Sequence, residues 1–316
     1  MVDGRLQVFA GTSHPALAAA IMAELEAPLG RAAVGTWKNG ETRVKLEENV
    51  RGSDVFVIQS LCEPVDHHIM ELLLMIDAAR RASAARITAV LPYYAYAKQE
   101  KKTSGREPIS AKLVANLIAT AGADRVLTID LHSPAIEGFF DIPVDHLRAT
   151  PLLARHIVRG ESGGSGEIVT VSPDAGGVAR AEEFRKRAGG SLAIISKIHP
   201  SPDVSEALGV VGDVDGRTAY IVDDMISTGG TLALAAERLR EQGARHIHCA
   251  ATHGIFAADA LGLIAGSSIE RVFVTDTIPL PARGPREKLT TVSVAPMLAE
   301  AIMRTHKDLS ISALFT

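Results

Sequence analysis

The sequence predicts an α/β protein of two similar domains, each a mostly parallel sheet flanked by helices. Short runs of β-branched and other apolar residues alternate with amphipathic helical patterns along the whole chain. The strand candidates are apolar at nearly every position, which is typical of parallel strands covered by helices on both faces. A length of 316 residues exceeds one small core and suits two domains of roughly 150 residues each.

The apolar runs predict strands in both halves of the chain. They cover residues 6–10, 54–59, 86–92, 125–130, 167–173, 192–196, 218–224, 246–252 and 271–276. Apolar residues at helical spacing predict helices over residues 64–81, 108–121, 176–188, 231–242 and 296–306. The order of these elements is the alternation that parallel sheets require, since parallel strands need a crossover connection.

We place the boundary between the two domains after residue 149, giving an N-terminal domain of residues 1–149 and a C-terminal domain of residues 150–316. Thr150-Pro151 and a Gly/Ser-rich run at 161–167 lie near this point, although the run suits a surface loop as well. Each half contains a strand that ends in carboxylates, at 125–130 and at 218–224. Ligands of open α/β sheets bind at the carboxyl ends of strands, so the site is expected there.

The composition argues against several kinds of partner. The formal charge of −4 and a pI near 6.3 disfavour a general nucleic-acid binder. No run approaches the roughly 18 apolar residues of a membrane span, and no signal peptide is evident at the N-terminus. Cys62 and Cys249 lie in apolar, strand-like stretches and are expected to be buried thiols. The expected compartment is the cytoplasm.

The sharpest local pattern is the end of the strand at 218–224 and the loop after it. The strand delivers Asp223 and Asp224 to its tip, and the following loop opens directly into a helix. The loop is rich in hydroxyl groups and glycine, and its residues are Ser227, Thr228, Gly229, Gly230 and Thr231. Backbone N–H groups and a helix N-terminus there suit a phosphate monoester, while the acids suit sugar hydroxyls or Mg²⁺. The alternative is an ordinary strand-turn-helix with Thr231 as the N-cap.

Two further strand ends carry possible metal ligands. His132 follows the strand at 125–130, and Asp174 follows the strand at 167–173. An imidazole and a carboxylate at two strand tips can hold one Mg²⁺ that keeps most of its water and takes phosphate oxygens. The alternative for His132 is a structural histidine with satisfied hydrogen bonds.

A basic segment follows the strand at 86–92. Lys98, Lys101, Lys102 and Arg106 place four positive charges within nine residues of a chain whose net charge is negative. Such a segment is either a solvated surface or a clamp for a triphosphate. The chain has no G-x-x-x-x-G-K-[ST] motif, so a nucleotide triphosphate would have to be bound by side chains and metal.

The loop at 223–231 resembles the ribose-phosphate motif that phosphoribosyltransferases share with phosphoribosyl pyrophosphate synthetases. Six other segments resemble the synthetases in order and spacing, namely residues 38–41, 92–99, 105–112, 130–133, 138–146 and 171–177. The resemblance runs from about residue 6 to the segment 312–315. The chain is therefore identified, by resemblance, as a member of the ribose-phosphate pyrophosphokinase family.

The resemblance implies an enzyme, usually a hexamer, that transfers pyrophosphate from ATP to the C1 hydroxyl of ribose 5-phosphate with Mg²⁺. It implies that ATP is bound by Trp37, Asn39, Gly40, Glu41, Lys98, Gln99 and Lys101, and Mg²⁺ by His132 and Asp174. It assigns ribose 5-phosphate to Asp223, Asp224, Ser227, Thr228, Gly229, Gly230 and Thr231. It makes Lys197, on a flexible loop, and His199 the catalytic residues.

Several positions depart from the family pattern. Lys98 and Lys101 replace arginines, which keeps the charge but loses the planar fork. Trp37 replaces a phenylalanine and can still stack on adenine, whereas Asn39 and Ser227 replace aspartates and His199 replaces an arginine. Two alternatives therefore stay open: a non-catalytic regulatory homologue, or a phosphoribosyltransferase, which needs no ATP site.

Overall fold

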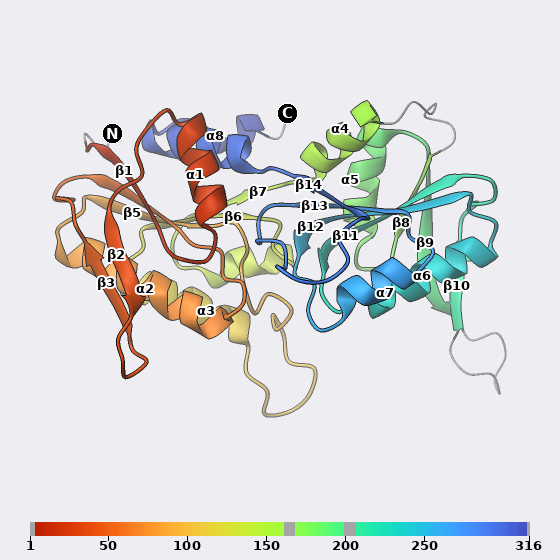
Figure 1. Cartoon of the computed structure of the whole chain (residues 1–316), viewed down its shortest axis with the longest axis horizontal. Coiled ribbons are helices and arrows are strands. Elements are labelled where there is room, and N and C mark those ends of the chain that lie inside the picture. Colours follow the sequence, from red (N-terminus) through yellow and green to blue (C-terminus); the bar gives the residue numbers. More distant parts are fainter. Residues whose placement is uncertain (1–3, 161–167, 199–206, 315–316) are drawn as a thin grey trace. The chain divides into compact units, whose positions relative to one another are not determined.

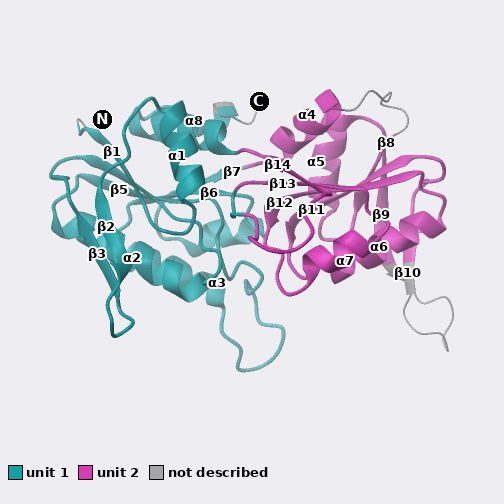
Figure 2. Cartoon of the chain, viewed as in Figure 1, with its two compact units in different colours: residues 1–147, 277–279, 294–316 teal, residues 148–276, 280–293 magenta. Residues whose placement is uncertain are grey.

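The computed structural model describes residues 4–160, 168–198 and 207–314. The chain forms two compact units (Figure 2): unit 1 comprises Met1–Leu147, Thr277–Pro279 and Val294–Thr316, and unit 2 comprises Arg148–Asp276 and Leu280–Ser293. Each unit is a largely parallel sheet with helices on both faces, which confirms the predicted fold class. These units differ from the predicted division at residue 149 because the C-terminal segment belongs to unit 1.

Unit 1 is built on a five-stranded sheet in which all neighbours are parallel. Its strands, in spatial order, are β1 (Leu6–Ala10), β4 (Asp54–Ile58), β5 (Arg86–Leu91), β6 (Arg125–Ile129) and β7 (Val144–Leu147). Figure 1 shows α1 (Pro15–Glu24) and α8 (Ala295–His306) over one face, and α2 (Val65–Arg81) and α3 (Ser110–Ala121) over the other. This cover explains why β4 is buried along its whole length.

A separate two-stranded hairpin and two short 3₁₀ helices complete unit 1. The hairpin pairs β2 (Ala32–Thr36) with β3 (Thr42–Leu46) in antiparallel register. The 3₁₀ helices are Pro134–Phe139, after β6, and Ile311–Leu314, after α8. Strand β3 packs against α2. Its alternation of half-buried and exposed residues is that of a strand with one covered face.

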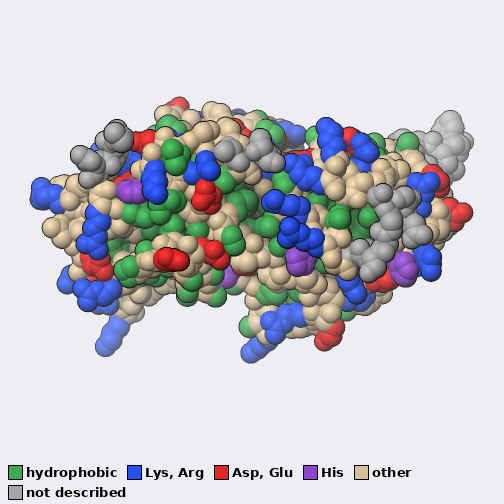
Figure 3. All heavy atoms as spheres, turned by 90° about the horizontal axis from the view of Figure 1, so that it is seen from above, with side chains coloured by type: hydrophobic (Ala, Val, Ile, Leu, Met, Phe, Trp, Pro, Cys, Tyr) green, Lys and Arg blue, Asp and Glu red, His purple; other side chains and the backbone are tan. Residues whose placement is uncertain are grey.

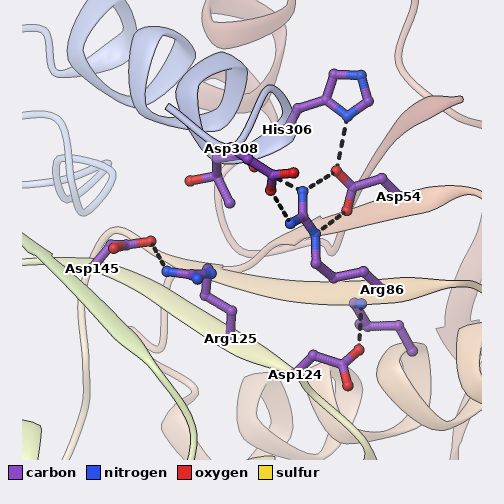
Figure 4. Close-up of polar contacts among 9 residues, drawn as sticks. Asp54, Arg86, Asp124, Arg125, Asp145, His306 and Asp308 are labelled. Atoms are coloured by element: carbon purple, nitrogen blue, oxygen red, sulfur yellow. Dashed lines mark hydrogen bonds and ion pairs between the residues drawn. The ribbon is translucent and has the colours of Figure 1, made fainter. Parts of the chain in front are cut away.

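The C-terminal segment of the chain is held on unit 1 by a cluster of charged groups at the amino ends of β4 and β5 (Figure 4). Asp54 is fully buried, and Arg86 Nε and Nη2 donate to its two oxygens at 2.8 and 2.6 Å. His306 Nδ1 lies 2.8 Å from Asp54 Oδ2, and Arg86 Nη1 donates to Asp308 at 2.9 Å. Side chains 252 residues apart in sequence thus meet in one hydrogen-bonded cluster.

Unit 2 is built on a seven-stranded sheet. Its strands, in spatial order, are β10 (Ala207–Val211), β9 (Ser191–Ile198), β8 (Ile168–Ser172), β11 (Thr218–Ile226), β12 (His246–Gly254), β13 (Arg271–Thr275) and β14 (Leu289–Val292). All neighbours are parallel except β10, which runs antiparallel to β9 at the edge.

The helices of unit 2 form one layer on each face of this sheet (Figure 1). They are α4 (Thr150–Gly160) and α5 (Val178–Ala188) on one face, and α6 (Gly230–Glu241) and α7 (Ala260–Gly266) on the other. Strand β11 contributes to both cores: Ala219 and Ile221 pack with α6 and α7, while Tyr220 and Val222 pack with α4 and α5. Burial on both faces is the physical reason for its continuous apolar run.

All nine predicted strands and all five predicted helices are present, with ends displaced by at most a few residues. The sequence analysis missed β2, β3, β7, β10 and β14 and the helices α1, α4 and α7. The missed strands lie in the hairpin or at sheet edges, where few residues are fully buried and the apolar run that marks a strand is short. Cys62 and Cys249 are buried free thiols, as predicted.

The surface carries both signs of charge. On the face shown in Figure 3, basic and acidic side chains are interspersed among the described residues, without one continuous basic area. No helix in the described parts of the chain combines the length and the apolar character that crossing a bilayer requires.

Candidate active site

The carboxyl ends of β8 and β9 and the N-terminus of α6 surround a cavity of about 380 Å³ in unit 2. It is lined by Pro173, Asp174, Ala175, Ile195, Ser196, Thr231 and Ala235. The cavity therefore brings together a predicted metal ligand, Asp174, and the last residue of the predicted phosphate loop, Thr231. These two residues are 57 positions apart in sequence and belong to different strand-to-helix connections.

The phosphate loop leads from β11 into α6. Gly229 is the N-cap of α6, with φ of 77°, and α6 begins at Gly230, so the alternative with Thr231 as the N-cap is wrong. A Cβ at Gly229 would lie 3.2 Å from the carbonyl oxygen of Ala260, and glycine avoids both this contact and the strain of positive φ. No described side chain caps this N-terminus. Its first N–H groups are therefore available to an anion.

Asp223 and Asp224 are the sixth and seventh of the nine residues of β11. Asp223 is half-buried and Asp224 is almost completely buried, with 35% and 3% of their side chains exposed. The Asp224 N–H donates to Asp223 Oδ1 at 2.8 Å. Burial, followed by the neighbouring Asp224 carboxyl, raises the pKa of Asp223 to about 7. The two adjacent acids therefore do not readily carry a negative charge at the same time.

Arg180, in the first turn of α5, faces this acid pair. Its Nη1 lies 3.1 Å from Asp223 Oδ1 and 3.5 Å from Asp224 Oδ1. The guanidinium opposes the rise in the pKa of Asp223. The sequence analysis missed this residue. The sequence offered a signal for it, since Arg180 lies one helical turn after Gly176-Gly177, in the helix that follows the connection carrying Asp174.

Asp174 is the second residue of the connection between β8 and α5. Its Oδ1 accepts the N–H of Gly177 at 2.8 Å, and its backbone carbonyl accepts the Ser172 hydroxyl at 2.6 Å. These contacts hold an exposed carboxylate at the edge of the cavity. Mg²⁺ commonly uses one or two carboxylates together with waters and substrate phosphates, so an exposed carboxylate beside a phosphate loop fits this ion.

His132 lies in unit 1, directly after β6, and is half-buried. The strand ends at Ile129, and the next residue, Asp130, adopts a φ of 38°, a left-handed conformation that Asp tolerates better than most residues. The Leu131 N–H donates to His146 Nε2 at 2.8 Å, and His146 Nδ1 contacts Glu137. The turn that presents His132 is therefore held by hydrogen bonds. Among the described residues there is no group of three His, Cys, Asp or Glu that could form an all-protein metal site.

Four of the predicted ATP-binding residues, Trp37, Asn39, Gly40 and Glu41, lie on the loop of the β2–β3 hairpin. The Trp37 N–H donates to the Glu41 carbonyl at 2.7 Å, and the Gly40 N–H donates to the Trp37 carbonyl at 2.9 Å. Gly40 has a φ of 92°, and the Glu41 N–H donates to Asn39 Oδ1 at 3.2 Å. The tight turn leaves Trp37 53% exposed, with the Arg43 guanidinium 5.1 Å from its ring centroid.

The predicted triphosphate contacts Lys98, Gln99 and Lys101 lie in the long loop between β5 and α3 (Figure 1), and all three are exposed. Glu107 organises this loop. Its carboxylate accepts hydrogen bonds from the N–H and hydroxyl groups of both Thr103 and Ser104, at 2.8–3.0 Å. The backbone N–H of Ser104 makes the largest contribution to lowering the pKa of Glu107 to about 2. The sequence analysis missed Glu107, although the Ser-x-x-Glu spacing marks it.

Lys197 lies in strand β9, where it pairs with Leu208 of the antiparallel strand β10. The prediction of a loop at this position is wrong. The physical reason is that β10 supplies the hydrogen-bonding partner that extends β9 beyond its apolar core, and the prolines at 200 and 202 come only later. His199, the second predicted catalytic residue, lies outside the described residues.

The chain is similar to known proteins over nearly its whole length. Residues 6–122 match the N-terminal domain of ribose phosphate pyrophosphokinase, and residues 195–316 match the phosphoribosyl synthetase-associated domain. The ribose-phosphate pyrophosphokinase of Caldanaerobacter subterraneus subsp. tengcongensis is 50% identical over 311 residues, which is 98% of each chain. The chain belongs to the ribose-phosphate pyrophosphokinase family.

Other members of the family give the same result. The ribose-phosphate pyrophosphokinase of Clostridium acetobutylicum is 47% identical over 98% of this chain and 97% of its own length. The crystal structure of phosphoribosylpyrophosphate synthetase from Mycobacterium smegmatis is 46% identical, with a TM-score of 0.89 over 96% of this chain and 99% of that one. The chain is therefore an enzyme of the ribose-phosphate pyrophosphokinase family with the α/β fold of such a synthetase.

Proposed function

We propose that the chain transfers the β,γ-pyrophosphoryl group of ATP to the C1 hydroxyl of ribose 5-phosphate, giving phosphoribosyl pyrophosphate and AMP. The observation that carries the proposal is the arrangement in unit 2, where Asp174 and Thr231 line one cavity at the start of α6. The acid pair Asp223–Asp224 belongs to the strand that leads into the same loop. A phosphate loop preceded by two carboxylates suits a sugar phosphate.

The sugar is assigned to the end of β11 and the loop after it. Asp223 and Asp224 would accept hydrogen bonds from the ribose hydroxyls. The backbone N–H groups from Ser227 to Thr231 would bind the 5-phosphate, where the N-terminus of α6 adds partial positive charge. Thr228, Gly230 and Thr231 are exposed, so this surface is open to a ligand.

The nucleotide is assigned to the hairpin and the basic loop of unit 1. Trp37 would stack on adenine, with Asn39, Gly40 and Glu41 presenting the turn that contacts the edge of the base. Lys98, Gln99 and Lys101 would neutralise and position the triphosphate. Asp174 in unit 2 and His132 in unit 1 are the proposed Mg²⁺ ligands, and the ion would supply charge neutralisation for the polyphosphate.

In the reaction the C1 oxygen attacks the β-phosphorus in line with the α,β-bridging oxygen. The new C1–O–P bond forms as the bond to AMP breaks, and the hydroxyl proton passes to solvent. Phosphoryl transfer of this kind needs positioning and charge neutralisation more than covalent chemistry by the protein. Lys197 and His199 would donate hydrogen bonds and charge to the migrating group. We place this reaction in the cytoplasm and expect an oligomer, a hexamer by family resemblance.

The test is formation of AMP from ATP, measured with ribose 5-phosphate and Mg²⁺ each omitted in turn. The proposal expects AMP only when both are present, together with an equal amount of phosphoribosyl pyrophosphate. A non-catalytic homologue would bind ATP without forming AMP. A phosphoribosyltransferase would consume phosphoribosyl pyrophosphate and a base without ATP. Lys197→Ala serves as the catalytically impaired variant in this assay. Its kcat should fall by a factor of about 10²–10³, while calorimetry should show that it still binds Mg-ATP.

A further inference from the structure

Arg180 links the start of helix α5 to the acid pair on strand β11. It is the third residue of α5, and the start of this helix is fixed by the hydrogen bond from the Gly177 N–H to Asp174. From there its guanidinium reaches across to β11 and lies 3.1 Å from Asp223 and 3.5 Å from Asp224. Its side chain is 20% exposed, so most of it is held by the surrounding protein.

The acid pair needs a cation of this kind. Two carboxylates on consecutive residues, one almost completely buried, repel each other in a site with little water. In a strand, consecutive side chains also diverge to opposite faces, which separates two groups that must serve one ligand. One guanidinium that contacts an oxygen of each carboxylate opposes both effects.

We propose that Arg180 is a positioning residue for ribose 5-phosphate, which orients the Asp223 and Asp224 carboxylates to accept the ribose hydroxyls. The inference rests on the proposed function of this loop. Arg180 is not assigned a contact with the substrate. It acts through the two acids, so its loss should affect the sugar and not the nucleotide.

The other titratable groups around the acids do not replace it. Cys249 and His253 on β12 pair with Ile221 and Met225, two residues before and after Asp223. Cys249 is fully buried, and burial raises the pKa of its thiol well above the ordinary range, so the thiol stays neutral. His253 is 1% exposed. The Arg180 guanidinium forms ion pairs with both acids, at 3.1 and 3.5 Å.

The test compares Arg180→Gln and Arg180→Lys with Arg187→Gln in the AMP-forming assay. Arg187 lies on the same helix but pairs with Glu183 at 3.5 Å, and serves as the matched control. For Arg180→Gln we expect the KM for ribose 5-phosphate to rise about tenfold to a hundredfold, as for the loss of a charge-assisted hydrogen bond. The KM for ATP should change less than twofold. Arg180→Lys should recover part of the loss, because lysine keeps the charge without the fork.

The pH profile separates positioning from a general structural role. Removing the guanidinium should raise the pKa of Asp223, so the acid limb of kcat/KM for ribose 5-phosphate should move to higher pH in Arg180→Gln. Thermal unfolding of each variant checks that the fold is kept. A variant with merely disturbed packing would weaken both substrates alike and leave the acid limb in place, and this result would overturn the inference.

Failure of this inference is distinguishable from failure of the proposed function. If the parent enzyme forms AMP as expected and Arg180→Gln keeps the parent's KM for ribose 5-phosphate and the parent's pH profile, only the role of Arg180 is wrong. If the parent enzyme forms no AMP under any combination of substrates, the proposed function is wrong, and the inference about Arg180 falls with it.

Discussion

The two units contain arginine–aspartate clusters at opposite ends of their strands, and the clusters differ in how completely the acid is compensated. At the amino end of β4, the single carboxylate of Asp54 receives two hydrogen bonds from Arg86 and a contact from His306. Near the carboxyl end of β11, two carboxylates share one guanidinium, that of Arg180, at 3.1 and 3.5 Å.

This difference in compensation separates a structural cluster from a binding site. The Asp54 cluster is closed, because donors occupy both oxygens of a carboxylate that has no exposed surface. The Asp223–Asp224 pair is open, since Asp223 keeps 35% of its side chain exposed and has a pKa raised to about 7 by burial. An acid with spare hydrogen-bonding capacity can accept sugar hydroxyls. We therefore expect substitutions in the first cluster to change stability and those in the second to change substrate binding.

The largest expected effect is that of Asp54→Asn on stability. This substitution leaves the largely buried Arg86 without its main partner, and breaking a buried pair in this way costs about 3–5 kcal/mol. The free energy of unfolding, measured by urea denaturation, should fall by that amount. The kcat per folded molecule should not change. Asp77→Asn is the control, because the exposed pair of Asp77 with Arg81 should contribute less than about 1 kcal/mol. Equal effects of the two substitutions would contradict the comparison.

The second prediction concerns Asp223→Asn and Asp224→Asn. Each should raise the KM for ribose 5-phosphate about tenfold to a hundredfold and leave the KM for ATP nearly unchanged, since a charged acceptor is lost only at the sugar. Stability at pH 8 should not fall for Asp223→Asn, because this change removes repulsion between a half-buried acid and an almost completely buried one. Steady-state kinetics with each substrate varied in turn gives the answer. A similar rise in KM for both substrates would contradict the assignment of this loop to the sugar.

The third prediction is a pH dependence with a defined sign. The raised pKa means that the folded chain favours the protonated Asp223, so the stabilising contribution of this group is complete below its ordinary pKa and is lost as pH rises through about 7. Binding of the sugar needs the ionised form of Asp223. Substrate binding should therefore weaken as pH falls, whereas the stabilising contribution increases. Between pH 8 and pH 6, kcat/KM for ribose 5-phosphate should fall about tenfold. In Asp223→Asn this limb should disappear, and an unchanged limb would assign it to another group.

The smallest expected effect is that of Arg43, whose guanidinium lies over the ring of Trp37. Trp37 is the single tryptophan of the chain, so its fluorescence reports on the hairpin alone. ATP should quench this fluorescence, while ribose 5-phosphate alone should not. Arg43→Gln removes the cation 5.1 Å from the ring centroid and should weaken ATP binding about twofold to fivefold, the size of an exposed cation–π contact. Fluorescence unchanged at saturating ATP would show that Trp37 does not contact the nucleotide.

The sequence by itself determined the elements that depend on local pattern. The central strands were predictable because burial on both faces requires apolar residues at every position, as in β11 up to Val222. The phosphate loop was predictable for a similar reason, since Gly229 must adopt a positive φ and the loop must open into a helix. Apolar runs and glycine-containing loops of this kind depend only on residues that are neighbours in the chain, so they can be recognised from a single sequence.

Tertiary structure alone decided which distant residues meet. Arg180 lies 43 residues before Asp223, and only the parallel pairing of β8 with β11 brings α5 to the acid pair. Lys197 is in a strand because β10 pairs with β9, a contact that the proline-rich segment between them conceals. The last helix, α8, packs on α1 in unit 1, where Arg86 and Asp54 bind its C-terminal end. Such contacts depend on how strands pair and helices pack, which local sequence does not specify.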